Sequence, residues 1–322
     1  MNKIQKNVLL SPYTTFGIGG TAKYFAEARS VEEVKEFCDW AKKNDSQVFV
    51  LGGGSNVLIS DKGFEGLVIK LKEPEDFDKF HFYAGPRNTK FVKVWAGSFL
   101  SKLIAETVAV GLTGLEWAVG IPGTIGGAVC GNAGAFGLET ANSVQTVEAL
   151  DCDNLTIKQF NNSGCDFCYR SSVFKYSDNL IILSAVFSFK KEDKKDIQKR
   201  LIDYAKQRTQ SFGAGQKCAG CFFKNVNWKR KDINKNKLLE NFPELKQFSD
   251  KPKISTGFLI DFVGLKGKKI GDAAVSDEHA NFILNTGNAK AEEIMMLSGL
   301  IKDKIYSRYG FLLEEEVRLV GF

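Results

Sequence analysis

Residues 120–137 constrain this chain more than any other segment, because seven of these eighteen residues are glycine and none is charged. The segment reads GIPGTIGGAVCGNAGAFG. So many glycines weaken a helix or strand interior, since each one loses much backbone entropy on folding. A backbone that binds a ligand without charged side chains offers N–H groups, which suit phosphates and flat polar rings. We therefore expect a ligand site lined by turns of the backbone.

A second glycine-rich turn, LGGGSNVLI, covers residues 51–59. It does not match the G-x-G-x-x-G pattern of dinucleotide-binding folds, and no Gly-Lys-Ser/Thr follows it, so a Rossmann site and a P-loop are disfavoured. Taken alone, the pattern is equally typical of a tight turn. Together with residues 120–137 it indicates one large cofactor that carries a diphosphate and is held at several points.

The overall composition is that of an ordinary soluble protein, with 43% hydrophobic and 25% charged residues among 322. This length predicts two or three domains. The net charge of +6 is mild, and its main cluster, residues 224–237, fits a solvated loop but is also compatible with an anionic substrate. We expect a cytoplasmic protein with no membrane partner, because no apolar run could span a bilayer and the first residues lack an apolar signal core.

Hydrophobic periodicity and capping signals predict an alternation of strands and helices without regular βαβ spacing, which favours the α+β class. The residues S30-V-E-E33 form a capping box that opens the first helix. The charge-dense run at 190–195 marks a domain junction, and residues 213–220 are expected to form a loop. Helices are expected through residues 31–41, 100–108, 197–205 and 291–309, and strands through residues 47–51, 66–71, 91–96, 144–150, 180–189, 279–285 and 311–320.

Two C-x-x-C pairs, Cys165/Cys168 and Cys218/Cys221, follow the usual pattern of zinc ligands. The gap between the pairs is longer than common zinc spacings, and the flanks of the first pair, residues 167–174, are typical of a strand. Neither pair opens a clear helix, which disfavours a thioredoxin-like dithiol. We expect no metal site. The seven cysteines are odd in number and so cannot form a complete internal disulfide set.

The end of the chain reads FLLEEEVRLV, and a period of two places Glu314, Glu316 and Arg318 on one face of a strand. Acids and a base on one face are equally the mark of a solvated edge strand, so both interpretations stay open. Lys175 is a further base on an expected strand. The two histidines, His81 and His279, are too isolated for a catalytic triad or a metal cluster, and His279 is expected to be structural.

Taken together, these segments resemble the bacterial UDP-N-acetylenolpyruvoylglucosamine reductases, also called UDP-N-acetylmuramate dehydrogenases, nearly from end to end. The order and spacing of the motifs make the match specific. Three departures stand out: Cys221 replaces the usual serine, and Val226 and Glu315 each replace a proline. The chain also lacks an extra tyrosine-bearing loop and is similar to the shorter type. The matching motifs are TTFGIGG at 14–20, LGGGSNVLI at 51–59, GLEWAVGIPGTIGG at 114–127, YRSSVFK at 169–175, AGCFFKN at 219–225, GLKG at 264–267, and the blocks at 276–285 and 313–318.

The resemblance implies an FAD-binding fold of the vanillyl-alcohol-oxidase-like type, with one subdomain at residues 1–72 and another at 73–192. A C-terminal α+β substrate-binding domain would follow at 193–322, and its last strand, 311–322, would return to the active site. Two rival interpretations remain. The chain could be another FAD-dependent oxidoreductase on the same fold, since fold does not fix the substrate, or a non-catalytic protein stapled by zinc.

The resemblance also implies the reaction. NADPH would reduce non-covalently bound FAD, and the enolpyruvyl ether of UDP-N-acetylglucosamine would then be reduced to UDP-N-acetylmuramate, a peptidoglycan precursor needed for cell shape and division. Arg170 would hold the substrate carboxylate, Glu316 would stabilise the enolate, and Cys221 would donate the proton. Arg208, Lys224 and Asn225 would contact substrate. We expect a monomer with no nucleic-acid partner. The expected FAD-binding residues are Gly52, Gly53, Gly54, Ser55, Asn56, Pro122, Gly123, Thr124, Gly126, Gly127, Ala128 and Gly134.

Overall fold

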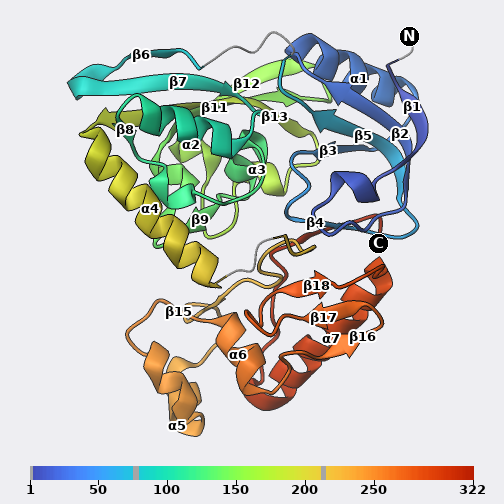
Figure 1. Ribbon diagram of the computed structural model, residues 1–322. Coiled ribbons are helices and arrows are strands. Elements are labelled where there is room, and N and C mark those ends of the chain that lie inside the picture. Colours follow the sequence, from blue (N-terminus) through green and yellow to red (C-terminus); the bar gives the residue numbers. More distant parts are fainter. Residues whose placement is uncertain (1–2, 75–79, 212–214) are drawn as a thin grey trace. The chain divides into compact units, whose positions relative to one another are not determined.

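The computed structural model describes residues 3–74, 80–211 and 215–322 (Figure 1). The chain forms two compact units. Unit 1 comprises residues 1–8, 22–54 and 64–210, and unit 2 comprises residues 9–21, 55–63 and 211–322. Neither unit is continuous in sequence, because two short N-terminal segments join the C-terminal part of the chain in unit 2. The divisions predicted at residues 72 and 192 stay predictions.

The first sheet of unit 1 has the strand order β1 (Gln5–Leu9), β2 (Thr21–Ala28), β5 (Phe64–Leu71) and β3 (Val48–Leu51). Strand β5 runs parallel to both β2 and β3, and its LVI run is fully buried, as is typical of parallel strands. Helix α1 (Val31–Lys43) follows β2. The Ser30 hydroxyl accepts a hydrogen bond from the Glu33 N–H at 3.2 Å, which confirms the predicted helix start.

The second sheet of unit 1 is antiparallel and contributes buried residues from β7 (Thr89–Trp95), β11 (Val144–Asp151) and β13 (Leu180–Lys191) to the core. Its order is β12 (Thr156–Asn161), β11, β13, β7 and β6 (Phe82–Ala84), and β8 (Leu112–Thr113) pairs with the end of β13. Helices α2 (Leu100–Ala109) and α3 (Ile125–Cys130) lie on one face of this sheet (Figure 1). A small hairpin, β9 (Gly134–Ala135) and β10 (Leu138–Glu139), follows α3, and α4 (Lys194–Ser211) follows β13.

Unit 2 combines three small sheets with three helices. Strands β16 (Lys269–Ile270), β17 (Ala273–Val275) and β18 (Ile283–Asn285) are antiparallel, β14 (Val226–Asn227) pairs with β15 (Lys253–Ile254), and β4 (Val57–Ile59) runs parallel to β19 (Arg318–Val320). The helices are α5 (Lys235–Asn241), α6 (Thr256–Phe262) and α7 (Ala291–Tyr309). Helix α7 has the predicted bounds and ends at Gly310, whose φ of +77° suits glycine.

Three predicted strands are wrong or too long. Residues 165–175 form tight turns and short 3-10 helices, because Asp166 and Arg170 have positive φ values of 46° and 58°, which a strand does not allow. Lys175 therefore lies in a 3-10 helix. The strand expected over 279–285 is limited to Ile283–Asn285, and the one over 311–320 to Arg318–Val320. Before Arg318 the pairing is irregular, because the N–H groups of both Glu316 and Val317 point to the carbonyl of Phe222.

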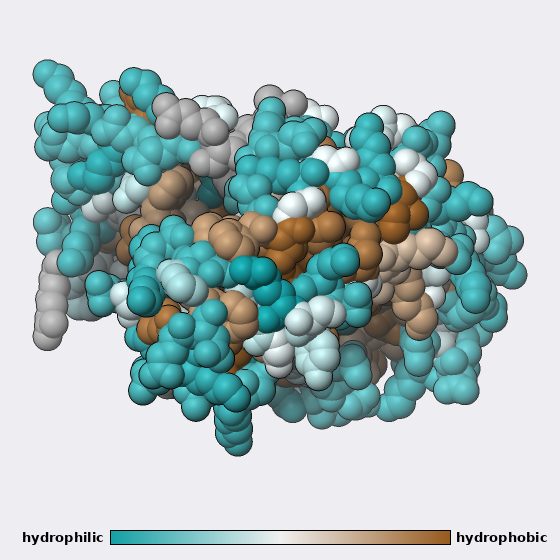
Figure 2. Space-filling model, turned by 90° about the horizontal axis from the view of Figure 1, so that it is seen from below, coloured by the Kyte–Doolittle hydropathy of each residue, from teal (hydrophilic) through white to brown (hydrophobic). Residues whose placement is uncertain are grey.

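The remaining short elements are 3-10 helices. Residues 215–220 are irregular, as predicted, whereas 213 and 214 lie outside the described residues. Among the helices of the described residues, none has both the length and the apolar character that crossing a membrane requires. The face in Figure 2 is mainly hydrophilic, with apolar residues gathered toward its middle. The 3-10 helices are Ser11–Tyr13, Pro86–Asn88, Glu116–Ala118, Thr140–Asn142, Ser163–Cys165, Val173–Lys175 and Pro243–Phe248.

Candidate functional site

The two glycine-rich turns touch each other within unit 1. A Cβ atom placed on Gly53 would lie 2.6 Å from the Cα of Gly123, and one placed on Gly52 would lie 2.7 Å from the hydroxyl oxygen of Thr124. Both distances are shorter than real Cβ contacts, so these positions require glycine for packing. The two turns are therefore neighbours in the fold, and their binding of one ligand stays a prediction.

The second glycine-rich turn is fixed by the connection between β7 and α2. The N–H of Gly126 donates to the carbonyl of Ala96 at 2.8 Å, and the N–H of Ile125 donates to the carbonyl of Ser98 at 2.9 Å. A Cβ on Gly126 would lie 3.0 Å from the Cβ of Ala96. Thr124 begins α3 and accepts a hydrogen bond from the Gly127 N–H on its hydroxyl. The turn therefore has a defined shape before any ligand binds.

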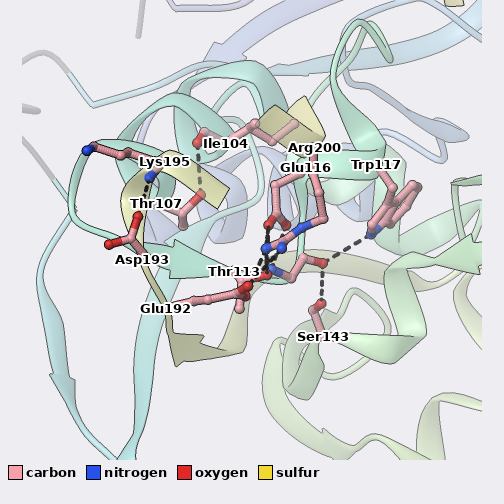
Figure 3. A network of polar contacts seen from close by, with 11 residues as sticks. Ile104, Thr107, Thr113, Glu116, Trp117, Ser143, Glu192, Asp193, Lys195 and Arg200 are labelled. Atoms are coloured by element: carbon pink, nitrogen blue, oxygen red, sulfur yellow. Dashed lines mark hydrogen bonds and ion pairs between the residues drawn. The ribbon is translucent and has the colours of Figure 1, made fainter. Parts of the chain in front are cut away.

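A buried acid anchors α4 to the loop that precedes this turn (Figure 3). Arg200 on α4 donates to the Glu116 carboxylate at 2.9 Å, to the Thr113 hydroxyl at 3.0 Å and to the Glu192 carboxylate at 2.7 Å. Burial alone would raise the pKa of Glu116. Hydrogen bonds from the Gly114 N–H, Thr113 and Arg200 outweigh the burial and hold the pKa below its ordinary value. Glu116 is therefore a charged, satisfied link between α4 and residues 113–116.

Arg208 lies about two helical turns beyond Arg200 on α4 and contacts both ends of the glycine-rich segment. A Cβ on Gly120 would lie 2.7 Å from the Cδ of Arg208. The Arg208 guanidinium carbon lies 5.9 Å from the ring centre of Phe136, and the ring of Tyr204 lies 4.9 Å from the same ring. The structure thus places Arg208 beside residues 120–137. Its assignment to substrate binding stays a prediction.

Arg170 has a strained backbone that its neighbours hold in place. Its φ of +58° is unusual for a residue with a long side chain. The Asn132 side-chain amide donates to the Cys168 carbonyl at 3.0 Å, and the Ser172 hydroxyl donates to the Cys130 carbonyl at 2.8 Å. These bonds tie both flanks of Arg170 to the end of α3. A Cβ on Gly134 would lie 2.9 Å from Nη1 of Arg170, so the predicted residues Arg170 and Gly134 are adjacent.

Cys221, Glu316 and Asn56 come together within unit 2. The Glu316 N–H donates to the carbonyl of Phe222, the residue after Cys221, at 2.8 Å. The Asn56 amide donates to the Glu316 carbonyl at 3.2 Å. Asn281, which the sequence patterns did not single out, fixes the Cys221 side of this arrangement, because its side chain donates to the Phe223 carbonyl and accepts from the Phe223 N–H. Three of the predicted residues are therefore local neighbours despite their separation in sequence.

Lys224 and Asn225 follow Cys221 closely in sequence, and both form hydrogen bonds with Thr256, the first residue of α6. The Lys224 ammonium lies 3.3 Å from the Glu314 carboxylate. The side-chain oxygen of Asn225 accepts a hydrogen bond from the Thr256 N–H at 3.0 Å, and the Thr256 hydroxyl donates to the Lys224 carbonyl at 2.6 Å. Asn225 thus orients the first turn of α6. The part of these two residues in substrate binding stays a prediction.

Cys218, of the second C-x-x-C pair, and His279 have surroundings that fit a structural role. All seven cysteines are free thiols. Burial raises the pKa of Cys218, and the Cys218 carbonyl accepts a hydrogen bond from the Thr15 hydroxyl at 2.6 Å. Burial lowers the pKa of His279, whose ring lies 4.8 Å from that of Phe282. Within the described part of the chain, no group of three or more His, Cys, Asp or Glu residues could hold a metal ion.

Comparison with known proteins identifies the family. Residues 189–320 match the model of the UDP-N-acetylenolpyruvoylglucosamine reductase C-terminal domain, and residues 22–158 match an FAD binding domain. The UDP-N-acetylenolpyruvoylglucosamine reductase of Protochlamydia amoebophila is 37% identical over 100% of this chain and 95% of its own length. The chain belongs to the UDP-N-acetylenolpyruvoylglucosamine reductase family.

Other relatives of this reductase family agree. The enzyme of the same name from Caldicellulosiruptor bescii is 33% identical over 97% of this chain and 89% of its own length. The crystal structure of UDP-N-acetylenolpyruvylglucosamine reductase from Thermus caldophilus has 30% identity and a TM-score of 0.75 and covers 98% of this chain and 99% of that one. These comparisons confirm the family resemblance, the predicted fold class, FAD as a cofactor and an FAD-dependent oxidoreductase.

Proposed function

We propose that this reductase uses NADPH and FAD to convert the enolpyruvyl ether of UDP-N-acetylglucosamine into UDP-N-acetylmuramate. The observation that carries the proposal is the full-length match to reductases of this name. Two local arrangements support it: the contact of the two glycine-rich turns in unit 1 and the meeting of Cys221 with Glu316 in unit 2. The product would be a peptidoglycan precursor, which gives the enzyme a part in cell-wall synthesis, cell shape and division.

The residues of unit 1 fit a large polar cofactor such as FAD. The backbone of residues 52–56 and 120–137 would hold it without charged side chains. In the part of the chain that the structure describes, the hydroxyls of Ser98 and Ser171 are buried without a hydrogen-bond partner. Ser98 adjoins the second glycine-rich turn, because its carbonyl accepts from the Ile125 N–H, and Ser171 follows Arg170. When bound, FAD supplies the hydride transfer between NADPH and the substrate.

Arg170 is assigned to the carboxylate of the substrate. Adding a hydride to an enol ether with an adjacent carboxylate produces an enolate-like species, whose negative charge needs a preorganised partner. A guanidinium binds a carboxylate through two parallel hydrogen bonds. The strained backbone at Arg170, held by the bonds of Asn132 and Ser172, supports this assignment, because such strain often accompanies preorganised sites.

Glu316 and Cys221 are assigned to the enolate and its proton. Glu316 would stabilise the enolate through hydrogen bonding, and Cys221 would transfer its thiol proton to the carbon next to the carboxylate. A thiol with a reference pKa of about 8.5 is a competent acid at neutral pH. The bond from the Glu316 N–H to the Phe222 carbonyl keeps the two residues on adjoining segments.

Arg208, Lys224 and Asn225 are assigned to contacts with the UDP sugar. Two of the three are cations, and the net charge of +6 favours the recruitment of two anionic small molecules, NADPH and the UDP sugar. The proposal also includes that the protein is a monomer, that it is located in the cytoplasm and that it has no nucleic-acid partner. It further includes three domains, with divisions at residues 72 and 192.

The test is NADPH oxidation by the purified holoenzyme with and without the enolpyruvyl ether, with the product identified by mass spectrometry. Oxidation that depends on this substrate and yields UDP-N-acetylmuramate is expected. A protein that contains FAD and oxidises NADPH equally well without the substrate would instead be a different FAD-dependent oxidoreductase on the same fold. A colourless protein with stoichiometric zinc would contradict both.

A further inference from the structure

Lys70 is a partly buried cation beside the first glycine-rich turn. It lies on β5 directly opposite Leu51, the last residue of β3, in the parallel register of these strands. Its ammonium donates a hydrogen bond to the carbonyl oxygen of Gly52. Lysine side chains usually extend so that the ammonium reaches water. Burial and the charge of Lys72 lower the pKa of Lys70, against the opposing effect of Glu27. Burial of this ammonium is unfavourable in free energy, so we expect its hydrogen bond to the Gly52 carbonyl to serve a function.

The contact determines the direction of the next amide. A peptide unit is planar, and in its trans form the C=O and the following N–H point in opposite directions. No cis peptide occurs among the described residues. Since the Gly52 carbonyl points at the Lys70 ammonium, the N–H of Gly53 points away from that ammonium. Glycine allows a peptide to turn either way at little cost, so residues 52–54 by themselves do not fix this direction.

We propose that Lys70 is a positioning residue for FAD, which holds the Gly52–Gly53 peptide so that its N–H is presented to the cofactor diphosphate. The ammonium also adds positive charge behind the turn, which favours a diphosphate electrostatically. This inference rests on the proposed function, in which residues 52–56 bind FAD. Lys70 acts through the backbone of the turn and needs no direct contact with the cofactor.

The experiment compares Lys70→Met with Lys70→Arg and with Lys72→Met as the matched control. Lys72 lies two residues after Lys70, just beyond the end of β5, and pairs with Glu27 at 2.7 Å. The measurements are the Kd for FAD, by fluorescence quenching, and the Tm of the FAD-free protein. Lys70→Met should weaken FAD binding about 10- to 100-fold, by more than any decrease in the Tm of the FAD-free protein accounts for. Lys70→Arg should restore most of the affinity, and Lys72→Met should bind FAD like the wild type.

Two results would overturn the inference: unchanged FAD affinity in Lys70→Met, or a loss of affinity that only follows a loss of stability in the FAD-free protein. Hydrogen exchange of the wild type with and without FAD tests the underlying assignment separately. If FAD does not protect the amides of residues 52–56, the proposed place of the cofactor is wrong. If FAD protects them and Lys70→Met binds FAD normally, only the role of Lys70 is wrong.

An independent observation concerns two thiols that are far apart in sequence and adjacent in unit 1. The sulfur atoms of Cys38, on α1, and Cys152, directly after β11, lie 2.9 Å apart. The two elements are also joined by the Lys42 ammonium, which donates to the Asp153 carbonyl at 2.6 Å. Cys38 is 2% exposed, whereas Cys152 is half-buried. The thiols are thus held together by the surrounding fold, and one of them is accessible.

The geometry points to a reversible disulfide between Cys38 and Cys152 that forms on exposure to hydrogen peroxide. The Cys152 sulfur attacks one peroxide oxygen, the O–O bond breaks, and a sulfenic acid and water result. The Cys38 sulfur then attacks the Cys152 sulfur, the S–S bond forms, and the hydroxyl group leaves as a second water with the Cys38 proton. Two thiols lose two electrons and the peroxide gains them. The Cys152 hydrogen bond and burial raise the pKa of Cys38, which disfavours Cys38 as the thiol that reacts first with the peroxide.

The disulfide would close a ring from residue 38 to residue 152 that contains both glycine-rich turns. A cross-link across so long a loop restricts the unfolded chain strongly. We expect the oxidised holoenzyme to melt several degrees higher than the reduced one. Digestion without reductant after peroxide treatment should give one cross-linked peptide pair containing Cys38 and Cys152, and dithiothreitol should reverse both effects.

Cys152→Ser is the matched variant, because it removes the accessible thiol and leaves a residue of similar size. It should keep the Tm of the reduced wild type and show no rise on peroxide treatment. Peptides that link other cysteines, peroxide-treated wild type that retains both thiols, or a Tm rise that persists in Cys152→Ser would each overturn the inference.

Discussion

Replacing Arg200 with methionine tests the anchor between α4 and the loop before the second glycine-rich turn. Methionine keeps most of the aliphatic stem but removes the donors to Glu116, Thr113 and Glu192. The Glu116 side chain is 5% exposed and would remain charged, with the N–H groups of Gly114 and Glu116 itself and the Thr113 hydroxyl as partners. We expect a loss of about 2 kcal/mol in the free energy of unfolding, the range for a hydrogen bond to a buried charge.

This magnitude lies below the roughly 3–5 kcal/mol for breaking a fully buried pair, because the Arg200 side chain is 38% exposed. A change of about 2 kcal/mol lowers the Tm of a domain of 150–250 residues by about 4–8 °C. The direction in which this stabilisation changes with pH follows from the pKa of Glu116. The folded pKa of Glu116 is depressed, so its stabilisation is fully present above the unfolded value of about 4.3 and disappears as the pH falls through the folded pKa.

The assay is thermal unfolding of the holoenzyme from pH 7 down to the lowest pH at which it stays folded. The Tm difference between wild type and Arg200→Met should be largest at neutral pH and should narrow below about pH 4.3. Arg308→Met is the control, because Arg308 forms a comparable pair with Glu244 in unit 2 at 2.8 Å. An unchanged Tm in Arg200→Met, or a difference that does not vary with pH, would refute the reasoning.

Three further variants test the proposed site. Gly126→Val should lose FAD, because its Cβ would lie 3.0 Å from the Cβ of Ala96 and displace the second turn; a purified variant with a full flavin-to-protein absorbance ratio would contradict this. Glu316→Gln should slow oxidation of the reduced flavin by substrate about 100-fold or more and leave reduction by NADPH nearly unchanged, and equal slowing of both half-reactions in stopped-flow experiments would remove Glu316 from its role. Cys221→Ala should abolish turnover but permit reduction by NADPH, whereas Cys221→Ser should stay active with less loss above pH 8.5, the reference thiol pKa. Normal turnover of Cys221→Ala would mean that the proton comes from another group.

Elements with complete local signals could be predicted from the sequence. Helix α1 has its cap at Ser30, and α7 ends at Gly310, so each carries its own start or stop signal. The glycine content of the two turns predicted that both serve one cofactor, whereas their contact is a finding of the structure. Gly53 and Gly123 now explain it physically, since their backbones meet where no side chain fits.

Features that depend on distant partners could not be predicted. Arg170 lies in a turn because Asn132 donates to the Cys168 carbonyl and Ser172 donates to the Cys130 carbonyl, and the hydrophobic pattern of residues 167–174 does not record those bonds. The irregular pairing before Arg318 depends on the Phe222 carbonyl, which accepts from two successive N–H groups. Nothing in the local sequence around Lys70 indicates its contact with Gly52, because the contact arises only from the register of β5 on β3.

The parallel pair β4–β19 has a consequence for how the chain folds during synthesis. Asn56 and Glu316 are joined across 260 residues, and Leu58 on β4 pairs with Leu319 on β19. Strand β4 therefore cannot pair with β19 on the ribosome until residues 318–320 have emerged. Contacts of such long sequence separation form slowly, so the β4–β19 pair would be among the last parts of unit 2 to form. Loss of residues 318–320 alone would leave β4 without this neighbour, a sharper dependence on one segment than the length of that strand suggests.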